Sequence, residues 1–410
     1  MKTVVLNLGC KVNQCECDSL LAGLKDLGHE VSCDLVPADN YIINTCAVTK
    51  EAERKSRQYV GKAKKLNPKA KIYVIGCAAE KNAEQFVGKD VTYVSGTAKK
   101  EQVLSFIEGV HIVPLPLAYE YMAEGETFRS RHFVKIEDGC NNYCAYCVIP
   151  YLRGSVRSRS VESIFNECKK AAEHTDEIVL TGINITCYGE DIGTSLSELI
   201  RHLAVLPVRV RLGSLEASII TEDFLSAVEE AGNVCPHFHL SLQSGSNAVL
   251  EAMARRYTTE EYYEKVELIR SRFPVAAITT DIIVGFPAER EEEFLETLAF
   301  AEKVAFSDIH VFPYSRRHGT AAYPLGALDP AVVKDRADRL IVLRDRLKRS
   351  YESAFVGSSL DVVVESTDGL FAEGYSENYI RVYLPDRDYP IGKKVTAYVE
   401  GERADGLVAR

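Results

Sequence analysis

The first part of the chain alternates between short apolar runs and longer segments in which apolar residues recur with a helical period. The apolar runs predict strands over residues 3–8, 40–45, 72–76 and 91–94. The segments between them predict helices over residues 16–27, 49–66 and 98–108. Strands separated by single helices indicate a parallel sheet, so residues 1–115 are predicted to form an open α/β sheet domain. No Gly-x-Gly-x-x-Gly motif follows the first strand, which removes the main support for a dinucleotide-binding fold.

Residues 116–127 are polar and acidic, and they predict a linker. The alternation then resumes, with strands expected over residues 132–137, 177–182, 208–213, 237–242, 275–285 and 306–313. Each is followed by a helical segment. Six βα units are fewer than the eight of a complete barrel, so residues 128–355 are predicted to form a partial (βα)6 barrel.

The helical pattern stops at about residue 356. Three short alternating strands, at 360–365, 379–384 and 394–399, are divided by turns that contain glycine. They predict a small β-barrel over residues 356–410. Such barrels commonly bind oligonucleotides, but this segment has ten acidic residues and six basic ones, so its composition does not indicate RNA binding.

Three cysteines, Cys140, Cys144 and Cys147, lie on one loop after the strand that ends at Gly139. Three thiolates can hold three irons of a [4Fe–4S] cluster and leave the fourth iron open to a small molecule. Zinc is the alternative, but a structural zinc site takes four protein ligands. His132 lies at the start of the preceding strand and does not complete the set, so the spacing favours an iron–sulfur cluster.

Three further cysteines, Cys10, Cys46 and Cys77, each follow a predicted strand of the first domain. The carboxyl ends of parallel strands share one edge of a sheet, so these thiols are expected to meet and to hold a second cluster. The alternative is three small buried residues at strand ends. The other cysteines of this domain, Cys15, Cys17 and Cys33, lack such a position and are interpreted as structural thiols.

Polar residues and glycines also follow the predicted strands of the barrel, where ligands bind. The candidates are Asn184, Glu216, Gln243, Ser244, Asp281, Gly285 and Pro287. Together they suit a small polar ligand, although each alone could form a turn or a helix cap.

The net charge of −10 gives no general attraction to nucleic acid, but basic residues cluster at 54–71, 153–159 and 334–349. The candidate phosphate contacts are Arg54, Lys55, Arg57, Arg153, Arg157, Arg344 and Lys348. A solvated helix face is the simpler interpretation of any one cluster.

The sequence shows no secretory leader and no apolar run of membrane-spanning length, so a cytoplasmic protein with reduced cysteines is expected.

The loop Cys140-x-x-x-Cys144-x-x-Cys147, with Tyr146 before the last cysteine, resembles the radical S-adenosylmethionine (SAM) superfamily. The wider string from Asp138 to Pro150, followed by Arg153-Gly-Ser-Val-Arg157, resembles the methylthiotransferases in particular. Those proteins combine an N-terminal cluster domain, a radical SAM barrel and a C-terminal TRAM barrel, in the order expected here. The branch that acts on threonylcarbamoyladenosine is the most similar, through the segments Leu8–Gln14, Ser214–Glu216 and Pro313–Arg317. The Cys15-Glu-Cys17 pair departs from the familiar pattern.

The resemblance implies that the cluster on Cys140, Cys144 and Cys147 reductively cleaves SAM to a 5′-deoxyadenosyl radical, which takes hydrogen from C2 of an adenine. Tyr146 and the five polar residues of the barrel, Asn184, Glu216, Gln243, Ser244 and Asp281, would hold SAM, and Gly285 and Pro287 would shape its pocket. A second [4Fe–4S] cluster on Cys10, Cys46 and Cys77 would supply the sulfur, and a second SAM would methylate it.

The product implied is 2-methylthio-N6-threonylcarbamoyladenosine at position 37 of tRNA. The implied partners are the anticodon stem-loop, an electron donor such as flavodoxin or ferredoxin, and an unknown sulfur donor. The alternatives are isopentenyladenosine in tRNA or an aspartate of a ribosomal protein as the substrate. A non-catalytic zinc or iron–sulfur scaffold is the alternative from another class.

Overall fold

The computed structural model describes all residues except 89–90, 99, 101, 110–129 and 386–388. The predicted linker, 116–127, lies outside the described residues. The chain divides into two compact units. The first comprises Met1–Phe128, Lys135–Tyr143 and Cys147–Ser160, and the second comprises Arg129–Val134, Cys144–Tyr146 and Val161–Arg410.

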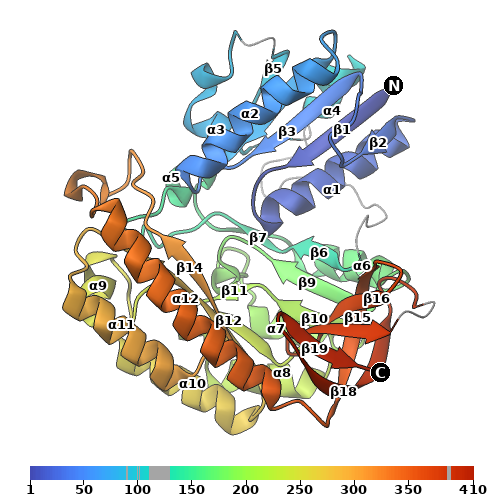
Figure 1. Cartoon of the computed structure of the whole chain (residues 1–410). Coiled ribbons are helices and arrows are strands. Elements are labelled where there is room, and N and C mark those ends of the chain that lie inside the picture. Colours follow the sequence, from blue (N-terminus) through green and yellow to red (C-terminus); the bar gives the residue numbers. More distant parts are fainter. Residues whose placement is uncertain (89–90, 99, 101, 110–129, 386–388) are drawn as a thin grey trace. The chain divides into compact units, whose positions relative to one another are not determined.

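The N-terminal part of the first unit is a five-stranded sheet with the order β2-β1-β3-β4-β5 (Figure 1). Its strands are β1 (Lys2–Asn7), β2 (Glu30–Ser32), β3 (Asn40–Thr45), β4 (Lys71–Gly76) and β5 (Tyr93–Val94). Every pair of neighbours is parallel, which confirms the predicted open α/β sheet. The short strand β2 was not predicted.

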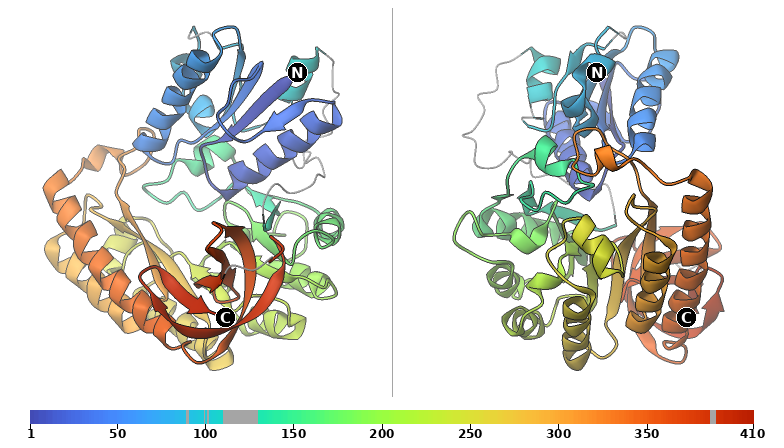
Figure 2. Two further views of the ribbon diagram at one scale, coloured as in Figure 1. Left: turned by 45° about the vertical axis from the view of Figure 1, so that its right-hand side comes forward. Right: turned by 90° about the vertical axis from the view of Figure 1, so that its left-hand side faces the viewer.

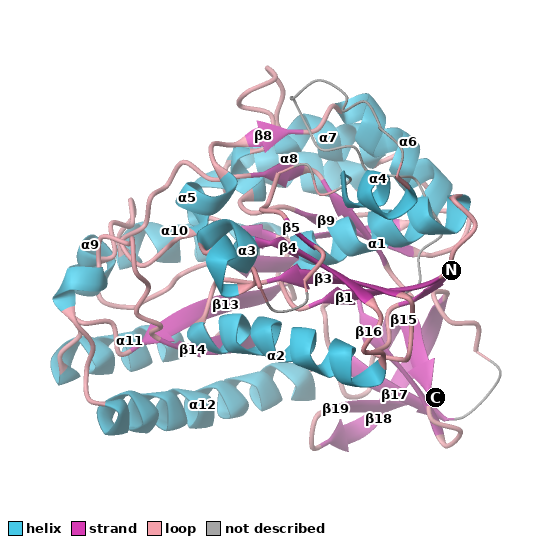
Figure 3. Cartoon of the chain, turned by 90° about the horizontal axis from the view of Figure 1, so that it is seen from above, coloured by secondary structure: helices cyan, strands magenta, loops and turns pink. Residues whose placement is uncertain are grey.

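Helices cover both faces of this sheet because its strands are apolar on both sides. The helices are α1 (Lys11–Asp26), α2 (Lys50–Leu66), α3 (Cys77–Lys81), η1 (Ala83–Gln85) and α4 (Gln102–Glu108). Leu20 and Leu24 of α1 pack with Val5 and Ile42 on one face. Val60 of α2 belongs to the core on the other face, and Figure 3 shows β1 and β3 between α1 and α2.

The rest of the first unit is a short hairpin-like pair around the cysteine loop. Strand β7 (Glu137–Asp138) pairs antiparallel with β8 (Arg157–Ser158), and α5 (Ile149–Arg153) lies between them in sequence. The pair closes the loop at its base, because Cys140 N–H donates to Gly154 O at 3.0 Å.

The barrel consists of two sheets, with the orders β10-β9-β6 and β11-β12-β13-β14. Figure 2 shows this part of the chain, coloured from green to orange, from two further sides. The strands are β6 (His132–Lys135), β9 (Glu177–Thr181), β10 (Arg209–Leu212), β11 (Ser214–Leu215), β12 (His237–Leu240), β13 (Ala277–Val284) and β14 (Asp308–Pro313). All six predicted strands are present, and their spatial order follows the chain. The third is interrupted at Gly213, which separates β10 from β11. The partial (βα)6 barrel is therefore confirmed.

The helical segments of the barrel alternate with these strands. They are α6 (Val161–Ala171), η2 (Ile185–Cys187), α7 (Leu196–Leu203), η3 (Ala217–Ile219), α8 (Glu222–Ala231), α9 (Asn247–Ala252), α10 (Thr259–Arg272), α11 (Glu291–Val304), η4 (Tyr323–Leu325) and α12 (Pro330–Ser353). Within the described residues, no helix is both long and apolar enough to cross a membrane.

The C-terminal segment is a closed five-stranded barrel with the order β15-β16-β17-β19-β18, as the prediction of a small β-barrel requires. Its strands are β15 (Ser359–Thr367), β16 (Phe371–Ser376), β17 (Arg381–Pro385), β18 (Lys394–Arg403) and β19 (Gly406–Ala409). Strands β16 and β19 were not predicted.

Two arginines of β10 fix the C-terminal barrel to the (βα) barrel within the second unit. Arg209 donates to Asp361 O at 2.6 Å, and Arg211 donates to Ser376 O at 2.8 Å. Both guanidinium groups also pair with the buried carboxylate of Glu177 on β9. Glu177 thus offsets part of the charge of the two arginines, while the arginines satisfy backbone carbonyls of the C-terminal barrel.

Candidate functional site

The three N-terminal cysteines lie at one edge of the first sheet. Cys10 directly precedes α1, Cys46 directly follows β3, and Cys77 directly follows β4. Strands β1, β3 and β4 are neighbours and run parallel, so these positions share an edge. Burial, assisted by the nearby charges of Cys77 and Cys10, raises the pKa of the Cys46 thiol to about 11. Strand pairing thus brings the three thiols to one edge of the sheet.

A buried network of charges adjoins this edge. Glu16 pairs with Lys100, with Lys135 at 3.4 Å and with Arg153 at 3.1 Å. Asp138 pairs with Lys135 at 2.7 Å and with Arg153 at 3.0 Å. Although burial opposes charge, these cations hold the pKa values of both carboxyls well below their usual range. Each buried carboxylate of this network is thus compensated by at least two cations.

Arg153 connects this network to the thiols. Its Nη2 donates to Asn13 Oδ1 at 3.1 Å, and Cys10 Sγ donates to the same oxygen at 3.2 Å. Burial raises the pKa of Cys77, while Arg153 and Lys100 act in the opposite direction. These two cations thus favour the thiolate form of Cys77, which is the form that binds metal, against the effect of burial.

The position of Arg153 corrects one expectation from the sequence. Its side chain is 1% exposed and is paired with Glu16 and Asp138, so it has no surface from which to contact an RNA phosphate. The pattern of basic residues around the loop could not separate a buried arginine from an exposed one. The acidic partner Glu16 is 137 residues away in sequence.

The cysteine loop is shaped first by Gly139. This residue has φ +89°, and a Cβ there would lie 2.0 Å from Ser155 O, so only glycine fits. Within the same unit, Ile149 N–H donates to Cys147 Sγ at 3.4 Å. A backbone donor to sulfur suits a thiolate ligand, since hydrogen bonds to cluster sulfurs tune iron–sulfur centres.

The segment Cys144–Tyr146 belongs to the second unit, where Arg255 is its main polar partner. Arg255 Nη1 donates to Cys144 Sγ at 3.3 Å and pairs with Glu216 Oε1 at 3.1 Å. Ala145 N–H donates to Met253 O at 2.9 Å, and Tyr146 packs on the apolar cluster that contains Met253. Arg255 thus joins a cluster cysteine to a candidate SAM contact, and sequence analysis missed it.

Two of the polar candidates are positioned by irregular backbone at strand ends. Asn184 precedes η2 and is buried, and its Nδ2 donates to Cys187 Sγ at 3.5 Å. Gln243 has φ +73°, and its N–H donates to Asp281 O at 2.8 Å. Its carbonyl accepts from Ile283 N–H at 2.9 Å, so the residue ties the end of β12 to β13.

Three others, Ser244, Gly285 and Pro287, lie in the backbone segments that follow β12 and β13. Ser244 is fully buried, and its hydroxyl lies 3.3 Å from the Thr297 hydroxyl on α11. Gly285 has φ +77° and would place a Cβ 2.5 Å from Val333 Cγ2, and Pro287 lies in the turn that follows. These three residues therefore support the backbone that follows β12 and β13, and they are not interpreted as direct polar contacts to a ligand.

The remaining candidate, Asp281, faces two histidines that the sequence analysis did not single out. Its Oδ1 lies 3.4 Å from His239 Nε2 and 3.1 Å from His310 Nδ1. The alternation of β12, β13 and β14 puts all three side chains on one sheet face.

The candidate phosphate contacts on α12 are neutralised by acids. Lys348 pairs with Asp308 at 2.9 Å, and Arg344 pairs with Asp345 at 2.6 Å. Other cations of this helix have acidic partners too: Lys334 with Asp338, Arg336 with Glu289, Arg339 with Glu291, and Arg346 with Glu302.

The candidate phosphate contacts on α2 are less fully paired with acids than those on α12. Arg54 pairs with Glu51 at 2.8 Å and Arg57 donates to Gln85 at 2.9 Å, while Lys55 is exposed and makes no ion pair within the described part of the chain. Arg157, the first residue of β8, is half-buried and donates to two backbone carbonyls.

Comparison with known proteins follows the same division of the chain. Residues 134–301 match the model of the Radical SAM superfamily, and residues 2–96 match that of the Uncharacterized protein family UPF0004. The radical S-adenosylmethionine methyltransferase TsrM from Kitasatospora setae has a similar fold, with a TM-score of 0.56 and 14% identity over 78% of this chain and 77% of its own. The partial barrel and its three-cysteine loop therefore define a radical SAM protein.

Relatives share nearly the whole chain. The threonylcarbamoyladenosine tRNA methylthiotransferase MtaB of Bacillus subtilis is 37% identical over 96% of this chain and 93% of its own length. The tRNA-2-methylthio-N(6)-dimethylallyladenosine synthase of Acetivibrio thermocellus is 34% identical over 87% of this chain and 79% of its own. The chain belongs to the radical SAM methylthiotransferase family, as its motifs indicated.

Membership of the superfamily implies a [4Fe–4S] cluster and SAM, as the sequence predicted. The donors at Cys144 and Cys147 fit such a cluster. A second cluster on Cys10, Cys46 and Cys77 stays a prediction, although the buried cations beside these thiols suit it.

Proposed function

We propose that this protein adds a methylthio group to C2 of N6-threonylcarbamoyladenosine at position 37 of tRNA. The main support is the 37% identity with the Bacillus subtilis threonylcarbamoyladenosine tRNA methylthiotransferase over 96% of this chain. Two sets of three cysteines in one enzyme also suit a reaction that needs both a radical and a sulfur donor.

In this proposal Cys140, Cys144 and Cys147 hold the radical cluster, and Asn184, Glu216 and the backbone around Gln243 position SAM. Bound together, cluster and SAM supply the carbon radical that removes hydrogen from a carbon with no useful acidity. Arg255 fixes the position of the Cys144 sulfur relative to the Glu216 carboxylate, because its Nη1 atom contacts both.

The sulfur would come from a second cluster on Cys10, Cys46 and Cys77. Arg153 and Lys100 offset the negative charge of its thiolates in a buried setting where water cannot. Asn13, which lies beside the Cys10 sulfur, accepts a hydrogen bond from Arg153 and so holds this cation next to the site.

The tRNA would meet the open cations of α2 and two tyrosines beside the cysteine loop. Tyr143 and Tyr151 are 50% and 59% exposed, and their rings meet edge to face with centroids 5.6 Å apart. Exposed aromatic rings stack on unpaired bases, which an anticodon loop offers.

The electron donor is proposed to be a flavodoxin or ferredoxin, and the sulfur donor is unknown. The cytoplasmic location and the domain limits at 115, 128 and 356 remain predictions.

Isopentenyladenosine is the second candidate substrate, because the Acetivibrio thermocellus relative that acts in that branch is 34% identical. The test is nucleoside mass spectrometry of tRNA from cells that lack the gene, with and without the restored gene. Restoration of the methylthio derivative of threonylcarbamoyladenosine supports the proposal. Restoration of only the isopentenyl derivative, or of a modified ribosomal protein, contradicts it. Failure to cleave SAM in the presence of dithionite would indicate a non-catalytic scaffold.

A further inference from the structure

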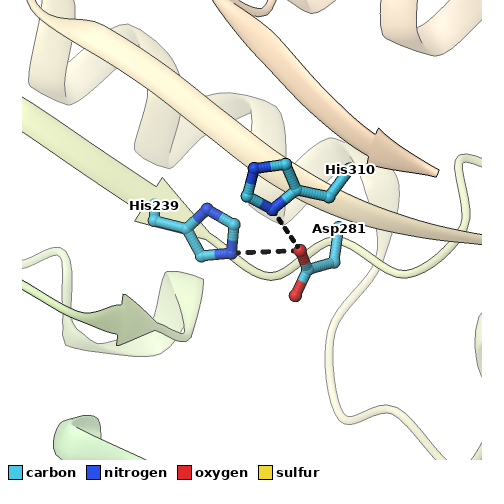
Figure 4. A group of neighbouring side chains, drawn as sticks. All are labelled: His239, Asp281 and His310. Carbon is cyan, nitrogen blue, oxygen red and sulfur yellow. Dashed lines mark hydrogen bonds and ion pairs between the residues drawn. The ribbon is translucent and has the colours of Figure 1, made fainter. Parts of the chain in front are cut away.

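Three neighbouring strands of the second unit bring two imidazoles and a carboxylate together. His239 on β12, Asp281 on β13 and His310 on β14 point toward one another (Figure 4). In the parallel register His239 pairs with Thr279, and Asp281 pairs with His310. Thr279 and Asp281 are two residues apart on β13, so their side chains and those of their partners His239 and His310 lie on one face of the sheet.

The distances between their polar atoms match the edges of a metal coordination shell. Asp281 Oδ1 lies 3.4 Å from His239 Nε2 and 3.1 Å from His310 Nδ1, and one ligand atom from each residue lies within 4.8 Å of the others. Zinc bonds of about 2.0–2.2 Å in a tetrahedron separate the ligand atoms by about 3.3–3.6 Å. The two edges made by Asp281 are therefore close to this range, and the third edge, between the two imidazoles, is within 4.8 Å.

The support around His239 is of the kind that orients a metal ligand. Its Nδ1 lies 2.9 Å from Thr279 Oγ1, so Nε2 is left to face Asp281. The same hydroxyl lies 3.0 Å from His237 Nε2, which fixes it in turn. A ligating histidine ordinarily makes such a hydrogen bond through its second ring nitrogen, because the bond sets the ring orientation and tautomer.

Exposure rises across the three side chains. His239 is 10% exposed, Asp281 25% and His310 52%. The set is thus anchored on its buried side and accessible from solvent on the other. Three protein ligands with one open side resemble a metal site that keeps a position for water or a ligand. Two nitrogens and one oxygen favour zinc, ferrous iron or nickel over magnesium and calcium, which prefer all-oxygen sites.

We propose that His239, Asp281 and His310 form a site for one divalent transition-metal ion of the zinc class, separate from both cysteine sets. The remaining coordination position takes water or an anionic group. Hydrogen bonds from two imidazoles to one carboxylate are the alternative arrangement, since 3.1 Å and 3.4 Å also approach hydrogen-bond lengths.

The test uses the full chain reconstituted anaerobically, so that the cluster cysteines are occupied. The enzyme is dialysed against zinc ions, and zinc and iron are counted per chain. We expect one zinc in addition to the cluster iron. His310→Ala and His239→Ala should each bind zinc at least 10-fold more weakly, and Thr279→Val about 10-fold more weakly. The matched control is His202→Ala, which removes an exposed histidine of α7.

X-ray absorption at the zinc edge distinguishes this site from zinc on stray thiols. Nitrogen and oxygen ligands give bonds of about 2.0–2.1 Å, whereas thiolates give about 2.3 Å. Zinc with nitrogen and oxygen ligands that is lost in His310→Ala and kept in His202→Ala supports the proposal. Absence of extra zinc, sulfur ligation, or equal binding by His310→Ala and the wild type overturns it. None of these readouts depends on the tRNA substrate, so failure here leaves the proposed function intact.

Discussion

The two cysteine sets of this protein are built in different ways. Cys140, Cys144 and Cys147 are neighbours in sequence, and a glycine turn and single N–H donors are enough to arrange the contacts seen at their sulfurs. Cys10, Cys46 and Cys77 are 36 and 31 residues apart and meet only when three strands pair. Their surroundings include five buried charges, whereas the contacts described for the loop sulfurs include a single guanidinium.

The difference indicates that the N-terminal thiols, which are buried because tertiary structure assembles them, need nearby cations to offset the charge of their thiolate forms. The strand-end thiols are buried with the core, and burial raises the pKa values of Cys46 and Cys77. Lys100, Lys135 and Arg153 supply positive charge there, and Glu16 and Asp138 keep these cations buried. The N-terminal site should therefore be sensitive to changes far from its ligands, and the loop should be sensitive mainly to its own residues.

Removal of either ligand set should have the largest effect and should separate their roles. Replacement of Cys140, Cys144 and Cys147 by alanine should lower the iron content from about eight to about four per chain and abolish both SAM cleavage and methylthiolation. Replacement of Cys10, Cys46 and Cys77 should lower iron equally but leave SAM cleavage in dithionite. The measurements are iron analysis and quantification of 5′-deoxyadenosine.

The control is Cys33→Ala, since this cysteine is exposed and lies outside both sets. Loss of SAM cleavage in the N-terminal triple variant would show that the two sets do not have separate roles. Loss of iron in the control would show that the count does not report on specific ligands.

Arg153→Met should have the next largest effect, on stability. It leaves Glu16 and Asp138 buried with one cation fewer, which costs about 3–5 kcal/mol when a partner of a buried ion pair is removed. Arg157→Met is the matched control: Arg157 is 35% exposed at its side chain and lies 3.8 Å from Asp138, so the loss should stay below about 1 kcal/mol. Urea unfolding measures both, and equal losses would contradict the role of the buried network.

Glu177 belongs to a buried charge cluster outside both cysteine sets and shows whether burial alone produces such sensitivity. Arg211 and Arg209 overcome the effect of burial and lower the pKa of Glu177 to about 2, from about 4.5. A lowered carboxyl pKa gives stability above pH 4.5 that is lost as the pH falls toward 2. The shift corresponds to about 3 kcal/mol at pH 7, of which about 2 should be gone at pH 3.

The measurement is the urea unfolding free energy of the wild type and of Glu177→Gln at both pH values. The difference between the two proteins should shrink by about 2 kcal/mol at pH 3. A difference that does not depend on pH would mean that Glu177 is not ionised in the folded protein.

Arg255→Met should have a smaller effect, confined to the loop. The variant removes the donor to Cys144 Sγ and leaves Glu216 without its partner at 3.1 Å. A lost supporting contact at a metal site typically costs 10–100-fold, so SAM cleavage should slow by that factor. Arg256→Met, next in sequence and exposed, is the control and should cleave SAM at the wild-type rate. Unchanged cleavage in Arg255→Met would remove this arginine from the site.

The same contrast explains how much could be predicted from the sequence. The alternation of apolar and polar residues gave the sheet, the partial barrel and the terminal barrel, and strand-end positions gave both cysteine sets. Short elements such as β2, with three residues, were missed because they are too brief for a period to show. Arg255, His239 and the buried role of Arg153 were also missed, since their partners lie far away in sequence and only packing brings them together.

The smallest effect concerns the two basic helices. The exposed Lys55 and Lys65 of α2 make no ion pair within the described part of the chain, whereas Lys348 of α12 is paired with Asp308 at 2.9 Å. Each α2 lysine that contacts a phosphate releases a counterion, so Lys55→Gln and Lys65→Gln should each weaken tRNA binding a few-fold and lower the salt slope by about 0.9. Lys348→Gln is the matched control and should leave the slope unchanged, because Asp308 already neutralises that charge. Filter binding between 50 and 200 mM salt measures the slope, and an equal loss from both helices would mean that ion pairing does not decide which basic helix meets the RNA.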